Sequence, residues 1–188
     1  MTEPASKPLL VLDLDETLIH ASETRLSIAP EPTFQVGPYH VYQRPWLPEF
    51  LTSAASHYRL AIWSAGSDDY VTAIADRILP AGIQFEFVWA RSRCVERYHP
   101  EFLDRYWVKD LKKVKRRGDD LRRVLIVDDT PRKLERNFGN AIYVRSFEGD
   151  PLDQELRRLA IYLAAIADCS DFRKLEKRNW RRAAPDQV

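Results

Sequence analysis

The sequence is poor in cysteine and has no long apolar segment. Cys94 and Cys169 are its only cysteines, and neither stands in a CxxC or Cys/His ligand pattern, which disfavours a secreted disulfide scaffold and a zinc ribbon. Every apolar run falls far short of the ~20 residues of a membrane helix, and the first residues lack the basic region of a signal peptide. We therefore expect a cytoplasmic protein, or a nuclear one in a eukaryote, that is neither secreted nor membrane-spanning.

An excess of charge of one sign is also missing. The sequence has 29 Lys and Arg against 28 Asp and Glu, so its formal net charge is +1. This balance disfavours recruitment to nucleic acid by overall charge and leaves a local basic patch open. With 45% hydrophobic residues, a chain of 188 residues buries roughly two-thirds of its unfolded surface and needs no disulfide or structural metal.

What the sequence does contain is a series of short apolar runs, each typical of a strand buried on both faces. Helical patterns lie between these runs and begin behind proline or capping residues. The alternation predicts a three-layer, doubly wound α/β domain with a parallel sheet over residues 9–182, between tails at 1–8 and 183–188. The expected strands cover 9–12, 58–64, 85–89, 124–129 and 141–144, and the expected helices cover 46–55, 69–79 and 153–167.

Two segments interrupt this alternation. Residues 20–45 contain several prolines and two β-like runs around Gly37-Pro38, which predicts a β-hairpin flap after the first strand. Residues 84–108 form an insertion before Lys109, and its part at 91–107 shows no regular pattern. The charged segment from Asp171 onward is expected to be a docked helix that frays after Arg182.

Two carboxylates follow the first apolar run. In an extended chain Asp13 and Asp15 point the same way, ~7 Å apart, at the carboxyl end of a strand. Such carboxylates repel each other unless a cation lies between them, and Mg²⁺ prefers oxygen ligands of this kind. A carboxylate left over beside that cation can attack phosphorus and form an aspartyl-phosphate. For a lone DxD motif, a helix cap with a solvated acid is the simpler interpretation.

A second acidic pair decides between these interpretations. Another buried run ends in Asp128-Asp129, so two strands deliver carboxylates to the same edge of the sheet. Between the pairs come Ser64, whose hydroxyl and following backbone amides suit phosphate oxygens, and Lys109, whose ammonium suits a transferring phosphoryl group. Singly, Ser64 is more often a cap and Lys109 a solvated charge. In this order the four elements predict a phosphoryl-transfer site.

The motifs resemble those of the haloacid dehalogenase superfamily of phosphotransferases. The segments are DLDETLIH at 13–20, WSAG at 63–66, VKDL at 108–111 and LIVDDTP at 125–131. They are most similar to the branch of small phosphatases that act on the C-terminal domain of RNA polymerase II, the nuclear LIM interactor-interacting factor family. This resemblance spans about residues 9–166. It implies a Mg²⁺-dependent protein phosphatase for phosphoserine or phosphothreonine that acts through an aspartyl-phosphate.

The resemblance also implies catalytic and metal-binding roles. Asp13 would be the nucleophile, and Asp15 would be the general acid and then the base toward water. The backbone carbonyl of Asp15 would bind Mg²⁺ together with the carboxylates of Asp13 and Asp128. Asp129 would hold a metal-bound water from outside the ligand set.

The same resemblance implies a phosphate cradle. Ser64, Ala65 and Lys109 would hold the phosphoryl oxygens, and Thr17 would order the loop after the first strand. The sequence departs from the family pattern at Ser64, where many relatives have Thr, and at Asp129, where small polymerase phosphatases commonly have Asn. The stretch 96–107 is also longer than the pattern predicts, and it lies where such enzymes build a peptide groove.

Three alternatives accompany this prediction. A receiver domain also forms an aspartyl-phosphate, but its acidic pair follows the first strand and its phosphorylated Asp comes later. A catalytically inactive phosphopeptide-binding adaptor can share the fold, although the complete motif set argues against it. A nucleic-acid-end or nucleotide phosphatase would use the basic run at 112–123, which is otherwise a solvated helix face. The sequence leaves the oligomeric state and the preferred metal open.

Overall fold

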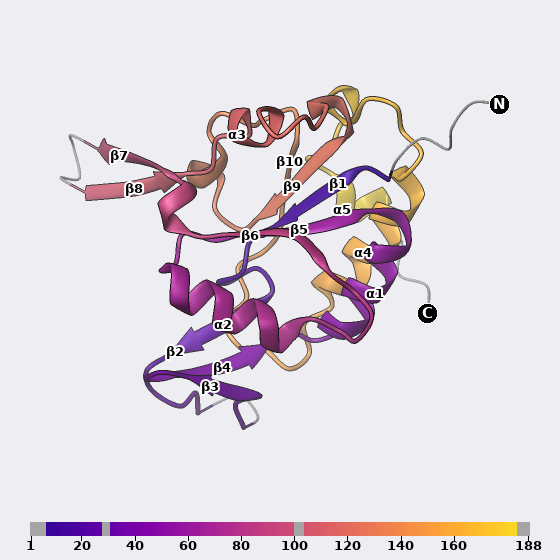
Figure 1. Cartoon of the computed structure of the whole chain (residues 1–188). Coiled ribbons are helices and arrows are strands. Elements are labelled where there is room, and N and C mark those ends of the chain that lie inside the picture. Colours follow the sequence, from indigo (N-terminus) through magenta and orange to yellow (C-terminus); the bar gives the residue numbers. More distant parts are fainter. Residues whose placement is uncertain (1–6, 28–30, 100–103, 184–188) are drawn as a thin grey trace.

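A five-stranded parallel sheet with the order β10-β9-β1-β5-β6 forms the centre of the molecule (Figure 1). The computed structural model describes residues 7–27, 31–99 and 104–183, so most of both predicted tails lies outside the described residues. The five predicted apolar runs form the five strands, because side chains that are apolar on both faces are buried between two layers. They are β1 (Leu9–Leu12), β5 (Arg59–Trp63), β6 (Phe85–Trp89), β9 (Val124–Asp128) and β10 (Ala141–Tyr143).

The strand order reverses at β1, as in a doubly wound sheet. Strands β5 and β6 lie on one side of β1, and β9 and β10 lie on the other. Leu12 pairs with Ile62 of β5 and with Val127 of β9, so the carboxyl ends of the three strands are level. In such sheets ligands bind in the crevice beside this reversal.

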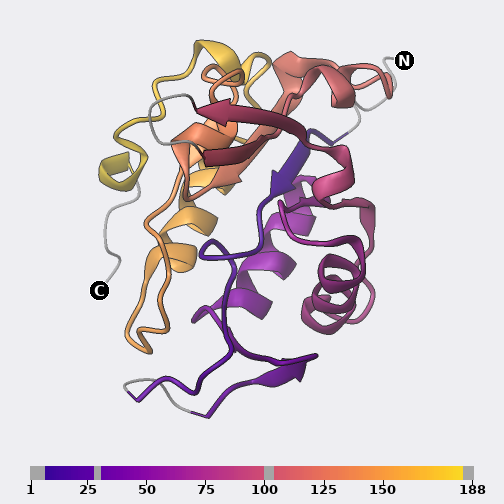
Figure 2. The same ribbon diagram turned by 90° about the vertical axis from the view of Figure 1, so that its left-hand side faces the viewer.

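Helices cover both faces of the sheet and give the predicted three layers (Figures 1 and 2). One face packs against the three longer helices, whose apolar stripes are buried together with alternate strand residues. The other face is covered by a short helix and by 3₁₀ turns at 121–123 and 131–134. The longer helices are α1 (Leu47–His57), α2 (Asp68–Ile78) and α4 (Glu155–Ile166), and the short one is α3 (Lys112–Lys115).

A separate antiparallel sheet lies beyond the end toward which β1 points (Figure 2). Its order is β2 (Ile19–Ser22), β4 (Tyr39–Gln43), β3 (Phe34–Val36). Strands β3 and β4 form the predicted hairpin, and Gly37 (φ 55°) supplies the left-handed turn between them. Strand β2, which was not expected, pairs with β4 and completes the sheet.

The insertion before Lys109 is more regular than its sequence predicts. Strands β7 (Val95–His99) and β8 (Asp104–Val108) form an antiparallel hairpin that projects from the domain (Figure 1). The expectation of an irregular stretch was wrong, because this hairpin is held by mixed polar and aromatic pairs and not by apolar alternation. Glu96, for example, lies opposite Trp107 and forms an ion pair with Arg105 at 2.9 Å.

The C-terminal segment is docked, but not as the predicted helix. It consists of a 3₁₀ turn (Phe172–Lys174) and a short helix, α5 (Trp180–Ala183). The carboxylates of Asp171 and Glu176 accept hydrogen bonds from backbone N–H groups two residues later, at 3.1 and 2.8 Å, and such local bonds compete with helix formation. Trp180, only 1% exposed, anchors the segment to the core.

Arg44, at the end of β4, ties the small antiparallel sheet to the helical layer. Its side chain is fully buried and donates two hydrogen bonds to the Asp153 carboxylate, at 2.9 and 2.8 Å. A third donor of the guanidinium reaches the backbone carbonyl of Thr17 at 3.0 Å. The loop after β1, the small sheet and the start of α4 therefore share one buried cation.

We expect Arg44→Met to lower the free energy of unfolding by about 2–4 kcal/mol, because the Asp153 carboxylate and the Thr17 carbonyl lose their donors. Urea denaturation measures this change. Arg25→Met is the matched control, since Arg25 pairs with Glu31 at the surface (2.8 Å), and it should change stability by less than about 0.5 kcal/mol. Equal losses in both variants would contradict the structural role of Arg44.

Candidate active site

The loop that follows β1 is fixed by its own backbone. The carbonyl of Leu14 accepts hydrogen bonds from the amides of residues 17, 18 and 19 at 2.8–3.1 Å. Glu16 has a left-handed conformation (φ 57°), which a non-glycine residue adopts only where its surroundings impose it. The resulting tight turn holds Asp13 and Asp15 at the carboxyl end of β1.

Asp13 lies between two ammonium groups. Lys109 Nζ donates to Asp13 Oδ1 at 2.6 Å, and Lys133 Nζ donates to Oδ2 at 3.1 Å. The Thr17 hydroxyl donates to the same Oδ2 at 3.4 Å. Burial would raise the pKa of the Asp13 carboxyl, but the positive charges of Lys109 and Lys133 hold this pKa below its usual value. Asp13 is therefore a buried carboxylate that stays ionised.

Asp128 and Asp129 complete this charged cluster at the end of β9. Lys109 Nζ donates to Asp128 Oδ2 at 2.5 Å, and Lys133 Nζ lies 3.6 Å from Asp128 Oδ1 and 3.4 Å from Asp129 Oδ1. Burial and the charge of Asp13 raise the pKa of Asp128 to about 6, against the opposing effect of Lys109. The sheet thus brings the acidic ends of β1 and β9 and both lysines into one cluster.

The donor set of this cluster fits a divalent cation. Carboxylate oxygens of Asp13, Asp128 and Asp129 lie within 4.8 Å of one another. They are hard oxygen ligands of the kind that Mg²⁺ prefers. Three carboxylates against the ammoniums of Lys109 and Lys133 leave a net charge of −1, so a dication is electrostatically compatible. The Asp129 carboxylate is close enough to the other two to contact such an ion directly. Its predicted role, to hold a metal-bound water, stays a prediction.

Asp15 has a different environment, although it is only two residues from Asp13. The Ser64 hydroxyl donates to Asp15 Oδ2 at 3.0 Å, and the Tyr70 hydroxyl donates to Oδ1 at 2.6 Å. Burial and the neighbouring charge of Asp13 raise the pKa of Asp15. Gly66 N–H in turn donates to Ser64 Oγ at 2.9 Å, which orients this hydroxyl.

The remaining predicted residues lie around these two carboxylates. The Ser64 hydroxyl donates to Asp15, whereas Lys109 donates to Asp13 and Asp128. The two residues of the predicted phosphate cradle therefore contact different carboxylates. The carbonyl of Ala65 accepts a hydrogen bond from Arg91 Nε at 2.7 Å. Thr17 is fully buried, and its role in ordering the loop stays a prediction. The contacts that the Ser64 hydroxyl, the Ala65 amide and Lys109 would make with phosphate stay predictions.

Two residues of the site were missed by the sequence analysis. Lys133 belongs to the 3₁₀ turn Pro131–Leu134, and its only signal is a position four residues after Asp129. Tyr70 belongs to the first turn of α2, which follows β5, and its hydroxyl reaches across to Asp15 in the loop after β1. The ring of Tyr70 also packs edge-on against Tyr39 of the small sheet, with 5.6 Å between the ring centroids.

Solved structures share this arrangement of sheet and helices. The fission yeast RNA polymerase II CTD phosphatase Fcp1 bound to beryllium fluoride aligns with a TM-score of 0.55 at 23% identity, over 76% of this chain and 42% of that chain. A second Fcp1 structure gives the same TM-score at 24% identity. The fold is therefore the haloacid dehalogenase-like α/β fold predicted from the motifs.

The family follows from the sequence comparison. The family model of NLI interacting factor-like phosphatases matches residues 8–173, and the chain belongs to this family. CTD nuclear envelope phosphatase 1B of Danio rerio is 30% identical over 187 residues, covering 92% of this chain and 72% of the relative. CTD small phosphatase-like protein 2 of Dictyostelium discoideum is 31% identical over 170 residues, 87% of this chain, which spans only 28% of that relative. The predicted resemblance is confirmed.

Membership of this family makes the chain a phosphatase homologue for which a divalent metal is implied. Across residues 7–27, 31–99 and 104–183, none of the helices combines the length and the apolar character that a bilayer crossing requires.

We expect Lys133→Met to bind Mg²⁺ or Mn²⁺ about tenfold more tightly than the unmodified protein in calorimetric titrations. The ammonium lies 3.1–3.6 Å from one oxygen of each carboxylate, and loss of a unit charge at that distance is worth on the order of 1–2 kcal/mol. Arg132→Met is the control, because the Arg132 guanidinium lies over the Tyr106 ring at 3.6 Å. Unchanged or weaker binding by Lys133→Met would show that the lysine and the ion do not share these oxygens.

Proposed function

We propose that this chain is a Mg²⁺-dependent phosphatase that hydrolyses phosphoserine or phosphothreonine in proteins through an aspartyl-phosphate on Asp13. The observation that supports it best is the opposite environment of two carboxylates two residues apart. Ammonium groups keep Asp13 ionised, whereas burial and the neighbouring charge of Asp13 raise the pKa of Asp15 against the opposing effect of its two hydroxyl donors. Such a separation is typical of a nucleophile beside a general acid.

In the first step an oxygen of Asp13 attacks phosphorus and the bond from phosphorus to the serine or threonine oxygen breaks. Asp15 gives its proton to this leaving oxygen, which would otherwise depart as a poor alkoxide leaving group. Lys109 offsets the negative charge that spreads over the phosphoryl oxygens. The products are the protein hydroxyl and the aspartyl-phosphate, with Asp15 now ionised.

In the second step Asp15 takes a proton from water and the water oxygen attacks phosphorus. The bond between phosphorus and Asp13 breaks, which releases phosphate and restores both carboxyl groups. Ser64 and Tyr70 hold Asp15 through both proton transfers, since each hydroxyl donates to one of its oxygens. Asp13, Asp128 and the backbone carbonyl of Asp15 would hold Mg²⁺, which when bound lowers the repulsion between the anionic nucleophile and the dianionic substrate.

The substrate class is inferred from the relatives. Fcp1 is an RNA polymerase II CTD phosphatase, and several relatives are named CTD phosphatases, which supports a phosphorylated protein as substrate. None of these names supports the nucleic-acid alternative. Relatives named for the nuclear envelope support a nuclear or envelope-associated location rather than a plainly cytoplasmic one.

We expect Asp13→Asn to abolish hydrolysis of p-nitrophenyl phosphate while the fold is kept, because an amide oxygen does not form the acyl phosphate. The assay is paired with circular dichroism of the same samples. Exhaustive EDTA treatment should also remove activity, and added Mg²⁺ should restore it. Full activity after EDTA would contradict the metal assignment, and an unmodified protein that binds phosphopeptides without turnover would support the adaptor alternative.

We expect Asp15→Asn to reduce phosphoserine hydrolysis by about 10²–10⁴-fold and p-nitrophenyl phosphate hydrolysis by much less. Serine leaves as a strongly basic alkoxide and needs a proton, whereas nitrophenolate leaves readily without one. Single-turnover rates of phosphoryl transfer with both substrates give the comparison. Equal reductions for the two leaving groups would contradict a proton donor at position 15.

A further inference from the structure

A basic hollow lies beside α3 at the edge of the domain. It has a volume of about 360 Å³ and is lined by Trp89, Arg93, Lys113, Arg116 and Arg117. All four charged residues of this α3 hollow are cationic, and no acidic side chain lines it. Three of them come from the basic run at 112–123, which the proposed chemistry does not use.

The cations of the α3 hollow are held in place by rings and carbonyls. The Arg93 guanidinium lies 5.5 Å from the ring centroid of Trp89, and the Arg117 guanidinium lies 4.5 Å from that of Phe87. Lys113 Nζ donates to the backbone carbonyls of Arg93 at 2.7 Å and Cys94 at 3.4 Å. These contacts position positive charge without neutralising it.

Ion pairing does not balance this charge. Within the described part of the chain the lining cations form one ion pair, between Arg117 and Asp119 at 3.9 Å. Asp119 already pairs with Arg59 at 2.6 Å, so its carboxylate neutralises little of the Arg117 charge. Arg93 and Arg116 have no carboxylate of a described residue within ion-pair distance. Four like charges gathered at one hollow repel one another, and an anion between them would relieve this repulsion.

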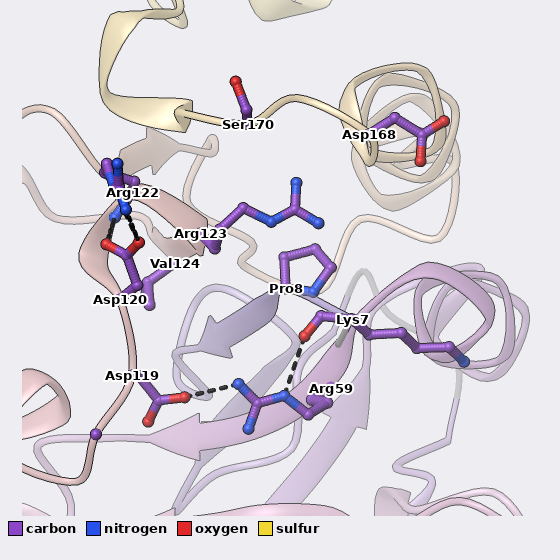
Figure 3. A pocket seen from close by; sticks show the side chains of 11 residues that line it. Lys7, Pro8, Arg59, Asp119, Asp120, Arg122, Arg123, Val124, Asp168 and Ser170 are labelled. Carbon is purple, nitrogen blue, oxygen red and sulfur yellow. Dashed lines mark hydrogen bonds and ion pairs between the residues drawn. The ribbon is translucent and has the colours of Figure 1, made fainter. Parts of the chain in front are cut away.

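A larger hollow, whose lining contains carboxylates as well as cations, offers a comparison (Figure 3). It has a volume of about 720 Å³ and lies where β1, β5 and β9 begin. There Arg59 pairs with Asp119 at 2.6 Å and Arg122 pairs with Asp120 at 2.7 Å. The second hollow is the larger of the two, but its carboxylates offset part of its positive charge. The α3 hollow has no carboxylate in its lining, so it is the better candidate for an anion site.

The α3 hollow is connected to the candidate active site by the 3₁₀ turn 91–93. The Arg91 amide donates to the carbonyl of Gly66 at 2.9 Å, and Arg91 Nε donates to the carbonyl of Ala65 at 2.7 Å. Both acceptors belong to the loop that follows Ser64. Arg93, at the far end of the same turn, lines the hollow. One short turn thus separates the hollow from the loop of the predicted phosphate cradle.

We propose that the α3 hollow binds a second anionic group, phosphoryl or carboxylate, on the same polypeptide as the phosphoryl group that is hydrolysed. This inference rests on the proposed function. Guanidinium groups match both anions with two parallel hydrogen bonds, and a hollow of this volume takes a single charged side chain. The chain is therefore expected to prefer substrates with an acidic or additionally phosphorylated flank.

The rest of the basic run argues against a nucleic acid as the occupant. A nucleic-acid backbone needs a continuous track of cations that face solvent. Arg122 instead pairs with Asp120 at 2.7 Å, and Arg123 donates to the carbonyls of Ala167 and Cys169. Of this run, Lys113, Arg116 and Arg117 line the α3 hollow, whereas Lys112 and Lys115 are exposed outside it.

The test compares three phosphoserine peptides that differ only in their flank, which carries a second phosphoserine, glutamates or alanines. The double variant Arg93→Gln/Arg116→Gln is matched by Lys115→Gln/Arg122→Gln, which removes two charges outside the hollow. We expect the first double variant to raise KM for one or both anionic-flank peptides about tenfold, with kcat and p-nitrophenyl phosphate turnover unchanged. The matched control should resemble the unmodified protein, and the two anionic peptides distinguish phosphoryl from carboxylate binding.

Binding of the same peptides to Asp13→Asn, followed by fluorescence anisotropy, tests the hollow independently of turnover. If Asp13→Asn prefers anionic flanks and Asp13→Asn/Arg93→Gln/Arg116→Gln does not, the α3 hollow binds the flank. This result would support the inference even if the unmodified protein hydrolysed no peptide, and only the proposed function would then fail. Equal affinity for all three flanks overturns the inference. Competition by a single-stranded oligonucleotide that depends on Arg93 and Arg116, without any flank preference, also overturns it and assigns the hollow to nucleic acid.

Discussion

The buried ammonium of Lys109 is the interaction on which the rest of the site depends. Parallel pairing of β1 with β9 places the carboxylates of Asp13 and Asp128 side by side, and Lys109 Nζ contacts both, at 2.6 and 2.5 Å. Without a cation between them, two ionised carboxylates in a fully buried position would oppose the packing of the two strands. The Lys109 backbone is equally fixed, because its amide donates to the carbonyl of Lys133 and its carbonyl accepts from Asn137. The lysine therefore joins three segments of the chain that are far apart in sequence.

The central sheet could be predicted from the sequence because each strand carries its own signal. A continuous apolar run that ends in a polar residue is local information, and burial on both faces is its direct consequence. The hairpin of β7 and β8 has no such signal, since Glu96 lies opposite Trp107 and its stability comes from pairs that only the folded chain brings together. The prediction of a C-terminal helix failed for a different reason: the carboxylates of Asp171 and Glu176 accept hydrogen bonds from nearby backbone amides, and such bonds compete with helix formation.

The same distinction applies to the candidate site. Asp13 follows β1 and Asp128 ends β9, so their positions at one edge of the sheet follow from the topology alone. Lys109 follows β8 of the separate hairpin, and it was found through the order of the motifs. Lys133 and Tyr70 could not be found in this way, because each has a long side chain that reaches a carboxylate after β1 from a turn or helix elsewhere in the sequence. Their sequence positions are those of ordinary surface residues, and only the folded geometry shows what the ammonium and the hydroxyl touch.

The register of the β7–β8 hairpin has a consequence for how this insertion can vary in length. Val108 pairs with Val95 at the base of the hairpin, and the next residue is Lys109. A two-residue slip of β8 against β7 would carry the ammonium about 7 Å away from the carboxylates. Residues added or removed beyond the His99–Asp104 pair leave the base unchanged. The outer part of the insertion is thus free to diverge in length and sequence, whereas the Val95–Val108 pair at its base fixes the position of the Lys109 ammonium.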